Sequence, residues 1–506
     1  MPHLLHRMRL SALLAILPPI AQAQDASVEP PPPPPTETSV APTATADAAP
    51  AVPSDAAARA DAAHGPPTPT APPDPFRFGG YGRVMGASDL AGGRGRPASI
   101  VPWGPRTNEG NYLELDFGYR AYDAPADDPV VVDTLVTLAV GEPFFHDSAD
   151  FDMSAAIRQA LVEARNVGFD GSFVWAGSRM YRGDDLYLFD FWPLDDLNTL
   201  GGGLGWRDAE QMLALHAGVS RPNDAFHVQQ VNVPGLAFGA AEAEVFDRQR
   251  TVVSLQGEQR FGGGDEIGLK VKLHLEFHAL PSGHRKVSDS YTESTPLPDD
   301  RGFLAGAQIG LWNFGQNSFA HLFLRYAAGL AAYGAWEKPF GLDADRRSLA
   351  AQELRAAVAG NYETGMLGVM YGGWIRGFRD ADGETIDFDD RIEAAVSVRP
   401  MLFIGRYFTP AVEISEQISH RNGLNPRTIT QEQARITQVA LMPALTFGDA
   451  PVGTLTRPQL RLIYSVSLLN DAALAMYPAD DPRARQDAVH FLGIGAEWWY
   501  GRGERR

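Results

Sequence analysis

The stretch IGLKVKLHLEFH, Ile267 to His278, decides the fold because its apolar and ionisable residues alternate strictly. The apolar set is Leu269, Val271, Leu273, Leu275 and Phe277, and the ionisable set is Lys270, Lys272, His274, Glu276 and His278. A period of two does not match the 3.6 residues per turn of an α-helix, but it gives a β-strand one apolar and one charged face. Two kinds of sheet contain such strands. One is a soluble antiparallel sheet with a single face on a protein core, and the other is a membrane barrel with lipid outside and a polar lumen.

The first 23 residues have the three-part pattern of a secretory signal peptide. MPHLLHRMRL contains His and Arg, SALLAILPPI is apolar, and AQA at Ala21–Ala23 supplies small residues for cleavage. The apolar run is shorter than the about 20 residues that a membrane-spanning helix needs. We therefore expect residues 1–23 to direct export.

Residues 24–75 have a different composition, dominated by Pro, Ala, Thr and Ser. Such a segment buries too little apolar surface to offset its ordering entropy, so we expect it to be disordered, with stretches of polyproline II. It is either a periplasmic arm that contacts the cell wall or an inert linker.

The overall composition limits the possible partners. The chain has no Cys, so no disulfide supports the exported protein. Its formal charge of −19 argues against a nucleic-acid partner, because phosphates require a basic surface. No apolar run after the N-terminus is long enough for a transmembrane helix, but barrel strands are apolar only at every second position.

Residues 76–506 repeat the alternating pattern of the opening stretch. It recurs in NYLELDFGYR, PQLRLIYSVSLL and HFLGIGAEWWY, with Gly, Asp and Pro clusters between the segments. One strand for every stretch of about 24 residues gives roughly 18 strands, an even number that places both chain ends on the periplasmic side. We therefore predict an all-β, antiparallel transmembrane barrel in outer-membrane lipid. The segment AAIRQALVEARNVGF has a helical composition, and we interpret it as a loop that leads into a strand.

Several segments together resemble the maltoporin family of sugar-specific outer-membrane porins, which includes sucrose porins. They are FRFGGYGRVMGAS, NEGNYLEL, FVWAGSRMYRGDDLYLFDFW, SVRPMLF, TRPQLRLIYSVS and GAEWWY, and WAGSRMYRGDD (Trp175 to Asp185) is the most specific of them. The resemblance covers residues 76 to 500. It implies an 18-stranded barrel, a homotrimer, loops folded into each pore, and sugar transport without a cofactor.

In that family a sugar slides along a file of aromatic rings while ionisable side chains hold its hydroxyl groups. A pyranose has apolar C–H faces and a polar rim, so flat rings and hydrogen-bonding partners suit it together. By resemblance, the slide residues are Tyr81, Tyr112 and Trp499. The polar track and constriction residues are Arg83, Arg106, Glu114, Arg158, Arg179, Asp185 and Tyr187.

Strand parity supports part of this assignment independently of the resemblance. Tyr81 and Arg83 share parity, as do Tyr112 and Glu114, so each pair faces one side of its strand. Trp499 has the opposite parity to the apolar residues of its strand and is expected in the lumen. The alternative is that these aromatic residues belong to interfacial girdles, which we expect for Trp498 and Tyr500.

The sequence also departs from the family pattern. The slide phenylalanine near GFLAGAQIG is missing unless Phe303 replaces it, and Glu393 and Ala394 stand where an aromatic pair is expected. The tryptophan that family members lend to an adjacent subunit has no match, and Phe151 is the nearest aromatic residue. These departures put the binding of long maltodextrins in question.

We considered three functions. The first is an outer-membrane channel for facilitated diffusion of disaccharides or oligosaccharides, the second is a general porin on the same scaffold, and the third is an outer-membrane enzyme. An outer-membrane enzyme such as a barrel lipase needs a nucleophilic serine, and the sequence has no G-x-S-x-G element. His274 and His278 are interpreted as pore-wall residues rather than metal ligands.

Overall fold

The computed structural model describes residues 75–125, 128–149, 151–234, 240–262, 266–287, 293–448 and 452–500. The expected signal peptide 1–23, nearly all of the segment 24–75 and the last residues 501–506 lie outside the described residues. Among the residues described, no helix is both long and apolar enough to cross a membrane.

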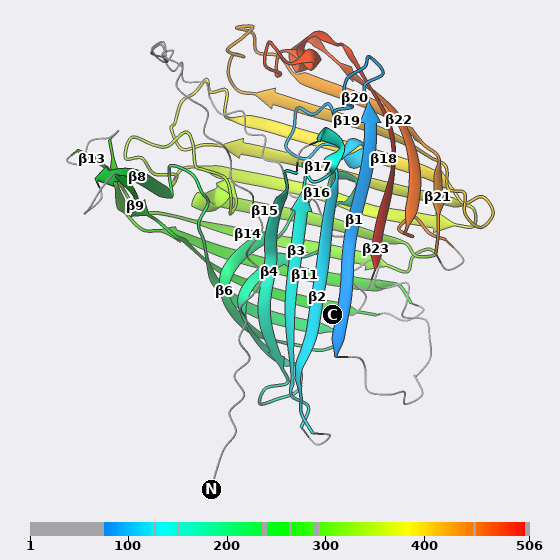
Figure 1. Cartoon of the computed structure of the whole chain (residues 1–506), viewed down its shortest axis with the longest axis horizontal. Coiled ribbons are helices and arrows are strands. Elements are labelled where there is room, and N and C mark those ends of the chain that lie inside the picture. The colour runs from blue at the N-terminus through cyan, green and yellow to red at the C-terminus, as the bar shows by residue number, and fades with distance from the viewer. Residues whose placement is uncertain are drawn as a thin grey trace, which may run out of the picture. The chain divides into compact units, whose positions relative to one another are not determined.

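One closed antiparallel sheet forms the wall of the molecule (Figure 1). Its first nine strands are β1 (Phe76–Ser88), β2 (Tyr112–Asp123), β3 (Val131–Gly141), β4 (Ser154–Arg165), β5 (Ser172–Arg182), β6 (Asp196–Arg207), β7 (Gln211–Ser220), β10 (Arg250–Phe261) and β11 (Gly268–Leu280). The others are β14 (Asp300–Trp312), β15 (Phe319–Gly329), β16 (Gln352–Thr364), β17 (Leu367–Arg379), β18 (Arg391–Leu402), β19 (Ala411–Arg421), β20 (Ala434–Met442), β21 (Ala444–Thr446), β22 (Gln459–Leu469) and β23 (Ala488–Tyr500).

The wall contains 18 strands, as predicted, because β20 and β21 are two pieces of one strand that both pair with β22. Pro443 separates the pieces, since proline has no N–H to donate to the ladder. Its carbonyl still accepts a hydrogen bond from the Leu462 amide (3.0 Å).

The first and last strands close the barrel. β1 pairs antiparallel with β23, and Tyr81 lies opposite Trp499 in that register. Figure 1 shows β1 in blue beside β23 in dark red. Closure satisfies the backbone groups of both edge strands, which is a requirement for a sheet in lipid.

The two ends of the barrel differ in their connections. Short turns, such as 208–210 and 365–366, lie at the end where β1 begins and β23 ends, which we call the terminal end. Long loops, such as 89–111 and 330–351, lie at the opposite end. In outer-membrane barrels the short turns face the periplasm and the long loops face outside, so the terminal end is periplasmic.

The remaining elements lie in these loops. They are the hairpins β8 (Val228–Pro234) with β9 (Ala240–Asp247) and β12 (Gly283–Lys286) with β13 (Ser294–Leu297), the helix α1 (Asp471–Leu474), and the 3₁₀ turns η2 (Arg106–Asn108), η3 (His146–Ser148), η4 (Tyr187–Phe189), η5 (Leu330–Tyr333) and η6 (Pro482–Arg485).

The alternation of the opening stretch is confirmed in β11. Leu273, Leu275 and Phe277 expose 58%, 48% and 49% of their surface on the outside, while Lys272 and Glu276 are buried on the lumen side. His274 and His278 are also on the lumen side and contact the Glu276 carboxylate at 2.6 and 2.7 Å. The soluble-sheet alternative would place an apolar face on a protein core, whereas this face is open.

The interpretation of 154–165 as a loop was wrong, because these residues form strand β4. Ala, Arg, Gln, Leu and Glu favour a helix locally, but β4 satisfies its backbone groups by pairing with β3 and β5. The register between β3 and β4 shifts between Thr137 and Leu138, which marks a β-bulge. The bulge interrupts the apolar–polar alternation of β4, so the strand is hard to recognise in the sequence.

An arginine at Leu275 is expected to destabilise the barrel in a depth-dependent way. Leu275 is in the middle of β11 on the outer face, and a charge at the bilayer centre costs about 2–4 kcal/mol. The matched control is Ile267→Arg, which is just beyond the strand end and should cost about 0–1 kcal/mol. Urea unfolding in phospholipid vesicles measures both values. Equal values for the two variants would contradict a lipid-facing β11.

Candidate functional site: the lumen constriction

Three long loops fold into the lumen and pack on its far wall. We call them L1 (89–111), L3 (183–195) and L9 (470–487), which connect β1 to β2, β5 to β6 and β22 to β23. Their apolar residues form one buried cluster with the lumen faces of β15 to β18. The cluster includes Ile100 and Val101 of L1, Leu186, Leu188, Phe189 and Phe191 of L3, Tyr477 of L9, and Phe323, Met370 and Trp374 of the wall. The lumen is therefore narrowed by packed apolar groups as well as by charges.

Lys270 and Lys272 hold L3 in place, which gives the charged face of the opening stretch a specific role. Lys272 Nζ donates to Asp195 Oδ2 (2.8 Å), and Lys270 Nζ donates to Asp184 Oδ2. Burial alone would raise the pKa of both carboxyl groups, but the two lysines hold the pKa of Asp195 below and that of Asp184 well below the ordinary value. These pairs therefore keep their stabilising effect at neutral pH and lose it only when the pH falls below the ordinary aspartate range.

Trp103 connects L1 to L3 and to the wall. Its ring stacks on Phe191 of L3 with a centroid distance of 4.0 Å and meets Trp374 of β17 edge-on at 5.2 Å. The Arg355 guanidinium lies 4.3 Å from the Trp103 ring centroid. Trp374 Nε1 donates to the Trp103 carbonyl (3.0 Å), which fixes the backbone of L1.

Glu497 is the centre of the polar constriction. This residue of β23 is fully buried, and its carboxylate accepts hydrogen bonds from Tyr81 (3.0 Å) and Tyr187 (2.8 Å). Arg106 of L1 donates to it at 3.1 Å and also donates to the Tyr81 hydroxyl at 2.6 Å. Arg457, in the turn between β21 and β22, donates to it at 2.6 Å. Through Glu497 the wall thus binds L1, L3 and a periplasmic turn at one point.

A second polar group lies beside the first. The Tyr112 hydroxyl donates to Glu114 Oε1 (2.6 Å), and Arg158 Nη1 donates to both residues at 2.8 and 2.7 Å. The Arg158 guanidinium gives Glu114, which is fully buried, the cation that its burial requires.

Arg83 joins this region to L1. Its Nη1 donates to Glu109 Oε2 (2.5 Å), and its Nε donates to the Gly110 carbonyl (2.7 Å). Burial raises the pKa of the Glu109 carboxyl to about 7, while Arg106 and Arg83 act in the opposite direction. The Glu109 carboxylate thus joins Arg83 of the wall to Arg106 of L1.

The three predicted slide residues lie together. Tyr81 and Tyr112 have ring centroids 6.2 Å apart, and Trp499 packs against the buried cluster that they form with Ala139. Trp499 is half-buried and lies 4.7 Å below the Arg457 guanidinium, whereas Tyr81 and Tyr112 are enclosed. Trp499 therefore offers the most open ring of the three.

The other predicted positions are distributed differently. Tyr187 lies in η4 of L3 and Asp185 is buried in the same loop. Arg179 of β5 lies in a separate group of contacts, where it donates to Glu163 (2.7 Å). Phe303 is on the outer face, next to Tyr326, so it does not replace the missing slide phenylalanine.

Several residues of the constriction were not predicted from the sequence, namely Glu497, Glu109, Arg457 and Arg461, which also donates to the Glu497 carboxylate from β22. Glu497 had a usable signal, because it shares parity with Trp499 in EWWY. Arg457 and Glu109 lie in a turn and a loop, where alternation gives no information.

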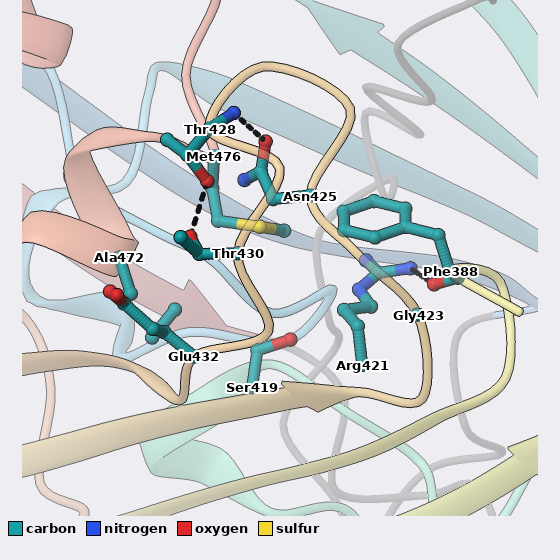
Figure 2. Close-up of a pocket in the computed structure, with 11 residues that line it drawn as sticks. Phe388, Ser419, Arg421, Gly423, Asn425, Thr428, Thr430, Glu432, Ala472 and Met476 are labelled. Atoms are coloured by element: carbon teal, nitrogen blue, oxygen red, sulfur yellow. Dashed lines mark hydrogen bonds between the residues drawn. The ribbon is translucent and has the colours of Figure 1, made fainter. Parts of the chain in front are cut away.

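The outer rim has a further small cavity and an acidic cluster. The cavity lies between the loop 422–433 and Phe388, and Arg421 donates to the Phe388 carbonyl at its edge (3.3 Å; Figure 2). Asp380, Asp387 and Asp389 have carboxylate oxygens within 4.8 Å of one another nearby in sequence. Within the part of the chain that the structure describes, this is the one group with metal-ligand spacing.

A closed barrel whose lumen is narrowed by inward loops and lined with ion pairs defines a channel of the outer membrane. The family model described as LamB porin matches residues 76–500, so this chain belongs to the LamB porin family. The family and the fold indicate a channel rather than an enzyme. No curated protein matches the sequence.

Solved structures of outer-membrane proteins resemble the chain weakly. The outer-membrane channel DcaP of Acinetobacter baumannii is 10% identical with a TM-score of 0.43, covering 84% of this chain and 97% of that one. OccAB2 of the same organism is 10% identical with a TM-score of 0.42, covering 84% and 98%. OmpT of Vibrio cholerae is 12% identical with a TM-score of 0.36, covering 85% and 99%. Similarities at this level say nothing about the solute.

Proposed function

We propose that this porin conducts sugars by facilitated diffusion, without a cofactor. The observation that carries the proposal is the placement of three aromatic rings beside ion pairs in the constriction. Trp499 supplies open apolar area for the C–H face of a pyranose, with Tyr81 and Tyr112 packed behind it, and Arg83 supplies donors for the hydroxyl rim. Several weak sites of this kind suit transport, because the solute must also leave.

The experiment is a sugar titration of single-channel current. Trp499→Ala is expected to weaken the block by maltose or sucrose about ten-fold, since an aromatic contact is worth about 1–1.5 kcal/mol. Tyr112→Ala should weaken it less, because Tyr112 is enclosed in this structure. The matched control is Tyr500→Ala, because Tyr500 is next in sequence and packs on Phe78 at the outer face (5.4 Å). Equal sugar affinity in all four proteins would overturn the slide.

The enclosure of Tyr81 and Tyr112 favours a second candidate, a general porin on the same scaffold. In this structure Arg106 donates to Tyr81, so a sugar reaches that ring only when L1 moves. Liposome swelling with sucrose and a non-sugar of equal size separates the two functions. A general porin admits both solutes at the same rate, and a sugar channel admits sucrose faster.

We also propose that the channel is a homotrimer. Phe151, in the loop 142–153, is 90% exposed, and its ring stacks on His146 with a centroid distance of 4.2 Å. An aromatic side chain that is so exposed suits contact with a neighbouring subunit. Phe151 would then take the place of the tryptophan that family members lend to an adjacent subunit.

We also propose roles for the two N-terminal segments. Residues 1–23 act as a signal peptide, and residues 24–75 lead into β1 at the terminal end, which faces the periplasm. A segment that enters the barrel there is in the right compartment to contact the cell wall.

A further inference from the structure

Five arginines of the lumen wall form one group at the periplasmic side of the constriction. They share the lumen face of neighbouring strands, because the outward residues beside them, such as Phe78, Val162 and Leu204, are exposed on the other face. We call them the lower arginine cluster: Arg77 of β1, Arg120 of β2, Arg165 of β4, Arg179 of β5 and Arg207 of β6.

The first carboxylate in this group is shared by three of the arginines. Asp133 of β3 lies 2.9 Å from Arg77 Nη2 and 3.4 Å from Arg120 Nε, and it also accepts from Arg165 Nη2. Arg120 has a second, longer contact with Asp123 (3.6 Å), a carboxylate that is mostly exposed. One carboxylate offers about four acceptor positions, and each guanidinium has five N–H donors.

The second carboxylate repeats the pattern. Glu163 of β4 accepts from Arg179 Nη1 (2.7 Å) and Arg207 Nη2 (3.1 Å), and Arg165 Nε lies 4.0 Å away. Arg165 thus connects the two carboxylates. These contacts set five arginines against three carboxylates, those of Asp123, Asp133 and Glu163.

The cluster is open to water, unlike the arginine group around Glu353 on the lumen wall. Its side-chain exposures are 33% for Arg77, 26% for Arg120, 29% for Arg165, 24% for Arg179 and 27% for Arg207. In the group around Glu353, Arg325, Arg355 and Arg376 are 7%, 5% and 3% exposed. Loops L1 and L3 cover that second group through Trp103 and Phe191. A solute in the lumen can therefore contact the lower cluster directly.

We propose that the lower arginine cluster binds the carboxylate or phosphate group of anionic solutes that pass through the channel. A guanidinium offers paired, parallel N–H donors that match these two groups, and it stays charged at every physiological pH. This inference rests on the proposed sugar channel and extends its solutes to anionic sugars. The buried rings of Phe173 and Trp175 hold two of the guanidinium groups in place, since Arg207 and Arg179 lie 5.2 Å from their respective centroids.

The experiment measures charge selectivity and solute block with the purified full-length protein in planar bilayers. A potassium chloride gradient gives the reversal potential. Glucose, glucuronate, glucose 6-phosphate and inorganic phosphate are then added to each side in turn. The wild type is expected to prefer chloride, and the three anions are expected to block at concentrations on the order of ten-fold lower than glucose. The separate anions show whether carboxylate or phosphate binds better.

Two substitutions with opposite expected effects test the cluster. Arg165→Gln with Arg207→Gln removes two charges and should abolish the advantage of the anions over glucose. Glu163→Gln removes a carboxylate and should increase that advantage, whereas a merely structural role would make both variants weaker. Arg347→Gln is the matched control, because Arg347 pairs with Asp299 in the outer loops (2.9 Å) and is 36% exposed.

The outcomes separate this inference from the proposed function. If glucuronate and glucose block equally and none of the variants changes the reversal potential, the anion site is overturned, and a block by neutral sugars would still support the sugar channel. If neutral sugars fail to block while anions do, the sugar channel is overturned and the anion site stands.

Discussion

Replacing Glu497 by glutamine is expected to lower the free energy of unfolding by about 3–5 kcal/mol and to increase the single-channel conductance. The Glu497 carboxylate is fully buried and is bonded by Arg106, Arg457 and Arg461. Glutamine keeps the shape of the side chain but leaves the guanidinium groups without their buried counter-ion. L1 is bound to the wall through Arg106, so the loss of this contact should loosen the constriction.

Urea unfolding and single-channel recording measure the two effects of Glu497→Gln. The control is Glu210→Gln, the same chemical change at an exposed position of the turn 208–210, which should change neither quantity. Glu497→Asp keeps the charge with a shorter side chain and should retain more of the stability than glutamine does. A Glu497→Gln protein with wild-type stability and conductance would show that Glu497 does not hold the constriction.

The barrel could be predicted from the sequence because its determinants are local. The alternation in β11 depends on neighbouring residues and on the chemistry of lipid and water, so it identifies both faces. Parity likewise placed Tyr81, Tyr112 and Trp499 on one side of the wall. The failure at β4 has a different origin, since pairing with β3 and β5 overrides the helical propensity of its residues.

The constriction could be predicted only in part, because its contacts join residues far apart in the chain. Arg106 and Glu497 are 391 positions apart, and the path of L1 through the lumen decides that they meet. The role of Lys270 and Lys272 shows the same limit. Alternation placed both lysines in the lumen, but only the fold of L3 shows that they bind Asp184 and Asp195.

The apolar part of the constriction, centred on Trp103, was not predicted from the sequence. Its removal is nevertheless expected to have a large effect on conductance and stability. Trp103→Ala is expected to increase the conductance and to lower the free energy of unfolding by about 3 kcal/mol. The indole fills the space between Phe191 and Trp374, and its removal leaves a cavity that the rigid wall cannot collapse to fill. It also uncovers Arg355, so we expect a shift of the reversal potential toward anions.

The control for Trp103→Ala is Trp336→Ala, which removes an indole that is 52% exposed in the loop 330–351. Trp103→Phe keeps an aromatic contact with Phe191 and should give an intermediate conductance. Because L1 is bound both through Arg106 to Glu497 and through the Trp103 ring, each single substitution leaves the other of these two contacts in place. The Trp103→Ala and Glu497→Gln double variant is therefore expected to conduct more than the sum of the two single effects. Additive effects would instead mean that the two contacts hold L1 independently.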